Sequence, residues 1–161
     1  MKTISGKIID RTWQRINDAA EEDAQRLLDV MAKSQPFLVA YLLAVEETLM
    51  AEEERGQLIL IGLILWEIIV AEHPRLRTVT MDDLEAAEKA NVKFLEDLEA
   101  GSEMDHMAAL QNLMTTYNQV DLLNAVIEAL MAGNEEEPEL AGEHVGLALL
   151  HLKSVLDCLD Q

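Results

Sequence analysis

One segment, residues Leu58 to Ala71, constrains the fold more than any other. Its fourteen residues, LILIGLILWEIIVA, contain a single charged side chain, Glu67. As a helix the segment measures about 21 Å, at about 1.5 Å per residue, whereas the hydrocarbon core of a bilayer is about 30 Å thick. A buried strand usually has only about 4 to 8 residues between turn signals. The segment therefore predicts a buried helix that other helices, or a second subunit, surround on every side.

The residues that flank this segment also argue against a membrane span. Glu52, Glu53 and Glu54 precede it and Glu72 follows it. Membrane segments are oriented by Lys and Arg on their cytoplasmic side, and these flanks lack such a bias. We expect no membrane association.

The charge of the chain limits the class of partner. The formal net charge is −19, with 9 basic and 13 acidic side chains in residues 1–77 but 3 basic and 18 acidic ones in residues 78–161. Proteins that bind nucleic acids neutralise phosphates with clustered Lys and Arg, so we expect no nucleic-acid partner. The acidic half either meets a basic partner or forms the solvated faces of helices.

Length and cysteine content suggest an ordinary intracellular domain. A chain of 161 residues is one domain by prior, so residues 1–161 are expected to form a single all-helical domain. Cys158 is the only cysteine, which excludes an intrachain disulfide and fits a reducing compartment. The first ten residues lack the apolar stretch of a secretory signal. We expect a cytoplasmic protein.

Apolar periodicity and capping signals predict about seven helices. Their expected spans are Asp10–Lys33, Phe37–Val45, Leu58–Ala71, Met81–Ala100, Ser102 to about Tyr117, about Asn118 to Gly133, and about Glu135 to Leu159. The second and third of these are the most apolar, and they follow each other in the chain. We therefore predict an all-α fold, a compact multi-helix bundle in which Phe37–Val45 and Leu58–Ala71 form a buried central hairpin.

Four local signals predict where these helices begin and end. Residues 52–56 are expected to form the turn before the central helix, and His73-Pro74 to stop that helix. Thr80, with Asp83 three residues later, resembles a capping box. Gly101 suits a left-handed cap after the helix that starts at Met81.

The strongest metal-binding pattern is Glu103 and His106. Residues three apart share a helix face, and ferritin-like di-iron bundles present a Glu-x-x-His pair twice, whereas this chain has it once. A divalent metal at Glu103 and His106 would need completing ligands, for which Glu67, Glu46 or Glu47, and His73 are candidates. The alternative interpretation is a glutamate that interacts favourably with the helix dipole and a histidine at the rim of the core.

Two polar residues on apolar helix faces are candidates for buried polar groups. Glu67, if buried, would have a raised pKa or would pair with Arg75 or Arg77; otherwise it marks the side of the central helix that reaches solvent. Asn91 lies on the apolar stripe of its helix, where a polar side chain can specify register or oligomeric state.

The last helix repeats a potential ligand every seven residues, at His144, His151 and Cys158. Seven residues rise about 10.5 Å along a helix, whereas zinc ligands lie about 2.0 to 2.3 Å from the metal. These three side chains are thus expected to have separate surroundings. The chain also lacks the G-x-S-x-G, P-loop and dinucleotide-binding patterns, so catalytic residues are not assigned and the protein is not expected to be an enzyme.

These features favour a non-enzymatic helical interaction or scaffold protein that forms a homodimer and has no cofactor. A second subunit that covered the central helix would be expected at Gly62 and Glu67. One alternative is a helical bundle that binds a divalent metal ion through Glu103 and His106. Another is a binder of a small apolar ligand, which would need a cavity between the central helices.

Overall fold

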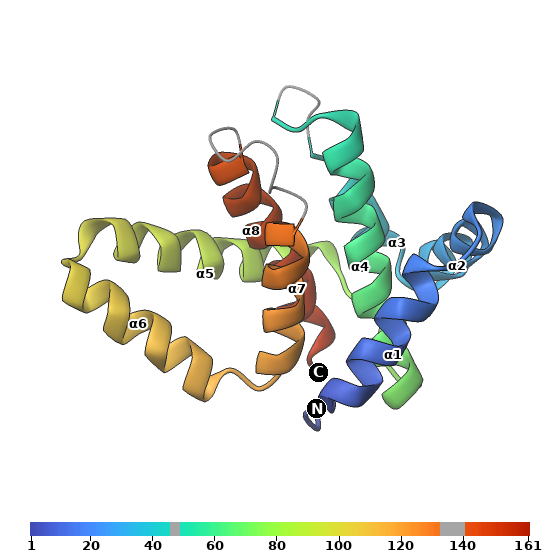
Figure 1. Cartoon of the computed structure of the whole chain (residues 1–161), viewed down its shortest axis with the longest axis horizontal. Coiled ribbons are helices and arrows are strands. Elements are labelled where there is room, and N and C mark those ends of the chain that lie inside the picture. Colours follow the sequence, from blue (N-terminus) through green and yellow to red (C-terminus); the bar gives the residue numbers. More distant parts are fainter. Residues whose placement is uncertain (46–48, 133–140) are drawn as a thin grey trace.

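The computed structural model describes residues 1–45, 49–132 and 141–161, and these residues form eight α-helices and no strand (Figure 1). The helices are α1 (Gly6–Asn17), α2 (Glu21–Ser34), α3 (Pro36–Leu43), α4 (Glu52–Glu72), α5 (Met81–Ala100), α6 (Glu103–Thr116), α7 (Val120–Ala132) and α8 (Ala141–Leu159). Among the described residues, no helix combines the length and apolarity needed to cross a bilayer. The all-α prediction is confirmed.

Helix α4 forms the centre of the core. No residue from Leu58 to Val70 is exposed, because α1, α2, α3 and α8 all pack against this helix. Helix α3 packs on it as the predicted hairpin partner, and the side chain of Leu42 lies directly over Gly62. Gly62 and Glu67 both face their own chain, so neither is left for a second subunit.

The single helix expected over Asp10–Lys33 is wrong, because the chain breaks at residues 18–20. Helix α1 ends with a hydrogen bond from the Asp18 N–H to the carbonyl of Gln14. The Ala20 carbonyl then accepts hydrogen bonds from the first turn of α2. The break lets α1 pack on α4 and α7 while α2 packs on α3 and α4. Three acidic residues begin α2, where their negative charges interact favourably with the positive end of the helix dipole.

Two further expectations about helix ends are corrected. Residues 52–56 are not a turn but the first turns of α4, where the Glu54 carboxylate accepts a hydrogen bond from the Ala51 N–H at 2.8 Å. Gly101 is extended rather than left-handed, with φ −84° and ψ 170°. A Cβ atom there would lie 3.1 Å from Cβ of Asp105, so a side chain at this position is restricted by space, because Asp105 would have to shift slightly, and not by backbone conformation.

Three other helix boundaries follow the predicted signals. Helix α4 ends before His73-Pro74, and the Thr80–Asp83 capping box starts α5. Ser102 caps α6, with its hydroxyl 3.3 Å from the Asp105 N–H. The predicted end of the sixth helix at Gly133 and the predicted last-helix start at Glu135–Pro138 lie outside the described residues.

The close approach of α3 and α4 gives a test of the core. A Cβ on Gly62 would collide with Cδ1 of Leu42, which is itself buried. Gly62→Ala gains about 1 kcal/mol of helix propensity, but overpacking costs about 1 to 3 kcal/mol. We therefore expect a net loss in the free energy of unfolding, measured by urea denaturation.

Gly56→Ala in the same helix is the matched control for this substitution. A Cβ at Gly56 meets nothing within 4 Å, so only the propensity gain of up to about 1 kcal/mol remains. Equal stability of the two variants would show that Leu42 does not restrict position 62.

Candidate functional site

Helix α6 stands apart from the rest of the molecule. None of its residues is buried, and its principal contact is with α5. Several of its large apolar side chains are exposed, including Met104 at 83%, Met107 at 69% and Leu110 at 45%. Figure 1 shows α5 and α6 projecting from the bundle as a hairpin, which we call the arm. Apolar surface of this kind usually has a function.

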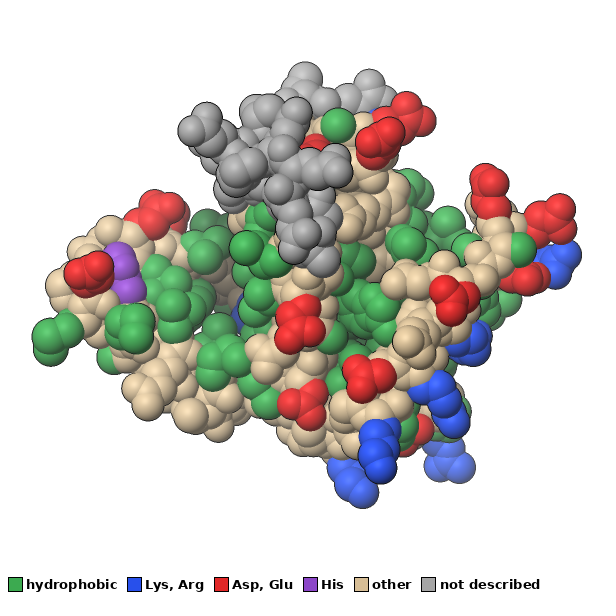
Figure 2. All heavy atoms as spheres, viewed as in Figure 1, with side chains coloured by type: hydrophobic (Ala, Val, Ile, Leu, Met, Phe, Trp, Pro, Cys, Tyr) green, Lys and Arg blue, Asp and Glu red, His purple; other side chains and the backbone are tan. Residues whose placement is uncertain are grey.

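Between the arm and the α7–α8 pair lies an apolar cavity of about 160 Å³, which we call the arm groove. Figure 2 shows hydrophobic side chains on both sides of the hollow between α6 and the centre of the molecule. The arm groove is lined by Asn91, Phe94, Leu95, Leu98, Leu110, Leu113, Met114, Leu123, Ile127, Gly146, Leu149, Leu150 and Lys153. The lining is thus almost wholly hydrophobic.

A hydrogen-bonded polar cluster lies at the floor of the groove, where α5 meets α8. The amide of Asn91, which is 6% exposed, donates to Ser154 Oγ at 3.1 Å and to Asp157 Oδ2 at 2.9 Å. Its Oδ1 accepts from Lys153 Nζ at 2.8 Å. All of its side-chain groups therefore have partners, as a buried amide requires.

Asp157 joins this cluster to α6. Tyr117, the residue after α6, donates its hydroxyl to Asp157 Oδ1 at 2.6 Å. Lys153 Nζ lies 2.8 Å from Asp157 Oδ2 and 4.9 Å from the centre of the Tyr117 ring. Burial and the charge of Asp157 raise the pKa of Tyr117, so the phenol remains a neutral donor. The cluster anchors the base of the arm.

The two predicted metal-binding residues lie at the tip of the arm. Glu103 is exposed in the first turn of α6, and His106 is half-buried with its Nε2 atom lacking a hydrogen bond. Within the described residues, no group of three His, Cys, Asp or Glu side chains is arranged to hold a metal ion. Of the candidate completing ligands, His73 follows α4 directly, whereas Glu46 and Glu47 lie outside the described residues.

Glu67 forms an ion pair with a residue that is distant from it in the sequence. Its carboxylate pairs with Arg15 of α1 at 2.7 Å and is largely buried, with 15% of the side chain exposed. The expected pairing with Arg75 or Arg77 is therefore wrong, since Arg77 pairs with Asp83 instead. The pair links α1 to the central helix.

The histidines and the cysteine of α8 have separate surroundings. His151 packs against the ring of Tyr41, with ring centroids 5.0 Å apart. Cys158 is 6% exposed, and burial together with the charges of Asp83 and Asp157 raises the pKa of its thiol to about 11. A group in this state is a poor nucleophile.

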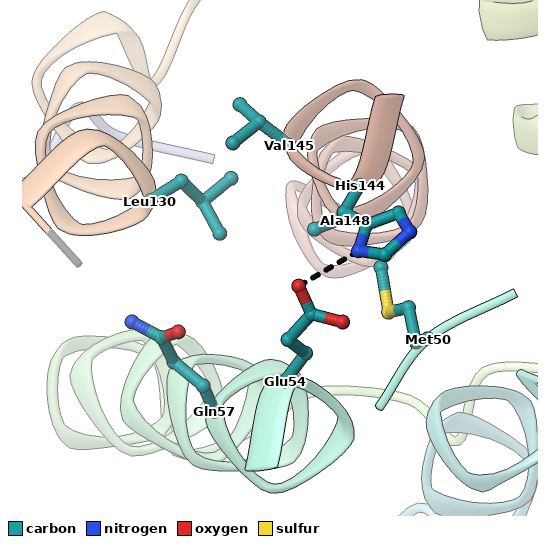
Figure 3. Close-up of a pocket in the computed structure, with 7 residues that line it drawn as sticks. All are labelled: Met50, Glu54, Gln57, Leu130, His144, Val145 and Ala148. Carbon is teal, nitrogen blue, oxygen red and sulfur yellow. Dashed lines mark hydrogen bonds and ion pairs between the residues drawn. The ribbon is translucent and has the colours of Figure 1, made fainter. Parts of the chain in front are cut away.

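His144 contributes to a second, smaller pocket. Figure 3 shows His144 of α8 and Glu54 of α4 pointing toward each other, and their Nδ1 and Oε1 atoms are 2.7 Å apart. Partial burial acts to raise the pKa of Glu54, but hydrogen bonds from His144 and the Ala51 N–H outweigh it and leave the pKa below its usual value. The cavity of about 30 Å³ is the size of one water molecule, which makes it a helix contact rather than a ligand site.

The residues that make the groove distinctive were not predicted from the sequence. Lys153 and Asp157 are four residues apart, a spacing that places them on one helix face, and Lys153 is the only basic residue after Lys93. This spacing could have been used to predict an ion pair between them. By contrast, the apolar stripe of α6 looks like any core-facing stripe, so its exposure had no sequence signal.

No protein-family model, curated protein or solved structure matches this chain.

Removing one hydroxyl tests whether the polar cluster holds the arm. Tyr117→Phe deletes the donor to the Asp157 carboxylate, and hydrogen bonds to charged groups contribute about 1.5 to 3 kcal/mol. We expect a loss of that size in the free energy of unfolding, measured by urea denaturation. Tyr41→Phe is the control, because the buried Tyr41 hydroxyl faces Ser154 and Glu88 without a close hydrogen bond to any residue that the structure describes, so its removal should destabilise less. Equal losses would mean that the Tyr117 hydroxyl has no anchoring role.

The raised pKa of Cys158 predicts a stability that falls in alkali. The unfolded thiol ionises near its ordinary pKa of about 8.5, whereas the folded one ionises near 11. Between these values the unfolded state binds fewer protons, so the free energy of unfolding falls as pH rises. Cys158→Ala should lack this part of the decline when unfolding is measured between pH 7 and 10. Superimposable pH profiles of the two proteins would contradict the prediction.

Proposed function

We propose that this protein is a helical interaction protein whose arm groove receives an amphipathic helix from a partner. The observation that carries the proposal is α6, a helix of 14 residues with no buried residue and with Met104, Met107 and Leu110 exposed. A helix that keeps apolar side chains in water gains stability from any partner that covers them.

The shape of the groove supports a helix as the occupant. Its walls are the helices α5, α6, α7 and α8, so the surface consists of ridges into which another helix can pack. The cavity of about 160 Å³ has room for side chains of the partner, while the partner helix itself would lie along the exposed face of α6, which is about 21 Å long at about 1.5 Å per residue. Peptide helices recognised in this way present apolar residues at i, i+3, i+4 and i+7.

The methionines of the arm suit such a surface. Met104, Met107 and Met114 are all exposed on α6. Methionine is unbranched and polarizable, so its side chain can adapt to differently shaped partners. Met114 lines the groove and the other two methionines lie nearer the arm tip, so the arm is suited to a sequence-tolerant helix interaction.

A second candidate function is the binding of a small apolar ligand, which the cavity of about 160 Å³ favours. The expected position for such a cavity was between the central helices, but it lies between the arm and α7–α8. Apolar cavities of about 150 Å³ bind molecules the size of benzene. Native mass spectrometry of the purified protein should reveal a retained ligand if this is the function.

A homodimer through the arm is the other way to cover this surface. Helices α5 and α6 carry nine acidic and two basic side chains, so two arms in contact would repel each other. We accordingly propose a different chain as the occupant. Light scattering after size-exclusion chromatography should give a monomer at micromolar concentration; a dimer that Leu110→Gln dissociates would identify a second copy as the partner instead.

The test uses an uncharged synthetic helix of 18 residues, with leucine at i, i+3, i+4 and i+7 and glutamine elsewhere. Leu110→Gln should weaken its binding by roughly tenfold or more, because covering a leucine contributes about 1.5 to 3 kcal/mol. Leu43→Gln is the control, since Leu43 is a comparably exposed leucine on α3 outside the groove. Isothermal titration calorimetry measures both. Equal effects of the two substitutions, or no binding at all, would refute the proposed site.

A further inference from the structure

We infer that the helix accepted by the arm groove is basic, with its Lys or Arg side chains at the end that lies over the arm tip. This inference rests on the proposed function, because it describes the chemistry of the partner at the same site. The inference is based on the positions of unpaired carboxylates relative to the apolar lining of the groove.

Two glutamates of the arm tip border the apolar surface. Glu103 precedes Met107, Leu110 and Met114 by four, seven and eleven residues, a spacing that places all four on one face of α6. Glu99 follows Leu95 by four residues and borders the lining of the groove on α5. A helix in the groove would pass both carboxylates as it reaches the tip.

Neither glutamate is neutralised by its own chain. Glu99 and Glu103 are exposed and form no ion pair with any residue that the structure describes. The nearest lysine or arginine in sequence, Lys93, pairs with Asp97 at 3.2 Å. The charges of the tip are therefore available to a partner.

The other end of the groove offers no competing positive charge. Lys153 is the only basic residue in the lining, and only 15% of its side chain is exposed. Asp157 and Asn91 accept hydrogen bonds from its ammonium group at 2.8 Å each. An acidic helix would thus meet repulsion at the tip without a free cation at the base.

Apolar contact and charge have different roles in this interaction. Exposed ion pairs contribute little affinity each, whereas a negative surface accelerates the approach of a basic partner in a salt-dependent way. The apolar lining supplies the affinity for a helix, and the glutamates select which helix. This division makes the two properties separable by experiment.

The experiment compares three synthetic helices that share the leucine pattern of the uncharged peptide. The positions beside the leucines carry lysine, glutamine or glutamate. At low salt we expect the lysine peptide to bind roughly tenfold more tightly than the glutamine peptide, and the glutamate peptide to bind least. The advantage of the lysine peptide should shrink as salt shortens the range of the interaction, to about 3 Å at 1 M.

Paired variants distinguish the local charge of the tip from the net charge of the protein. Glu99→Gln with Glu103→Gln should remove most of the lysine peptide's advantage and leave binding of the glutamine peptide unchanged. Glu21→Gln with Glu22→Gln changes the net charge equally, but on α2 at the opposite side of the molecule (Figure 1), and should have little effect. Thermal melts by circular dichroism check that both variants fold.

The outcomes separate this inference from the proposed function. Equal effects of the two double variants would overturn the inference, because net charge alone would then select the helix. Equal binding of the lysine and glutamate peptides would overturn it as well. In both cases the proposed function would still be supported if the glutamine peptide bound in a way that depends on Leu110. If none of the three peptides bound, the inference and the proposed function would both be refuted.

Discussion

Helix α4 has no solvent face from Leu58 to Val70, so the bundle must enclose it with other helices. Helices α1, α2, α3 and α8 use apolar faces for this purpose, and α3 comes so close that position 62 admits only glycine without a shift of Leu42. Helix α5 then packs on α8. In that arrangement α6 packs mainly on α5 and reaches the core through Leu113, so most of its apolar face stays exposed. The exposed arm follows from how the helices are distributed around α4.

Features that depend on neighbouring residues were predictable from the sequence, whereas those that depend on tertiary neighbours were not. The capping pairs Thr80–Asp83 and Ser102–Asp105 act over three residues, so their spacing was sufficient to place two helix starts. The break at residues 18–20 was missed because the apolar spacing continues through it. Only the separate packing of α1 and α2 explains the break.

The candidate site shows the same division. The position of Asn91 on an apolar stripe indicated a buried amide, but its partners Lys153, Ser154 and Asp157 lie more than sixty residues away. Likewise, the apolar spacing of α6 predicted a helix with an apolar face, but amphipathicity does not reveal whether that face meets a core, a groove or solvent. The groove is a property of the packing and could not be predicted from the sequence.

Charge explains how a protein can keep such a surface uncovered. An exposed apolar groove tends to bind any apolar surface, including a second copy of itself. In this chain the groove belongs to the half of the sequence with 18 acidic and 3 basic side chains, so two copies that approach through their arms repel each other. The same carboxylates attract a basic helix. One distribution of charge therefore opposes self-association and favours a particular class of partner, which is why the apolar lining and the acidic tip are best understood as parts of one site.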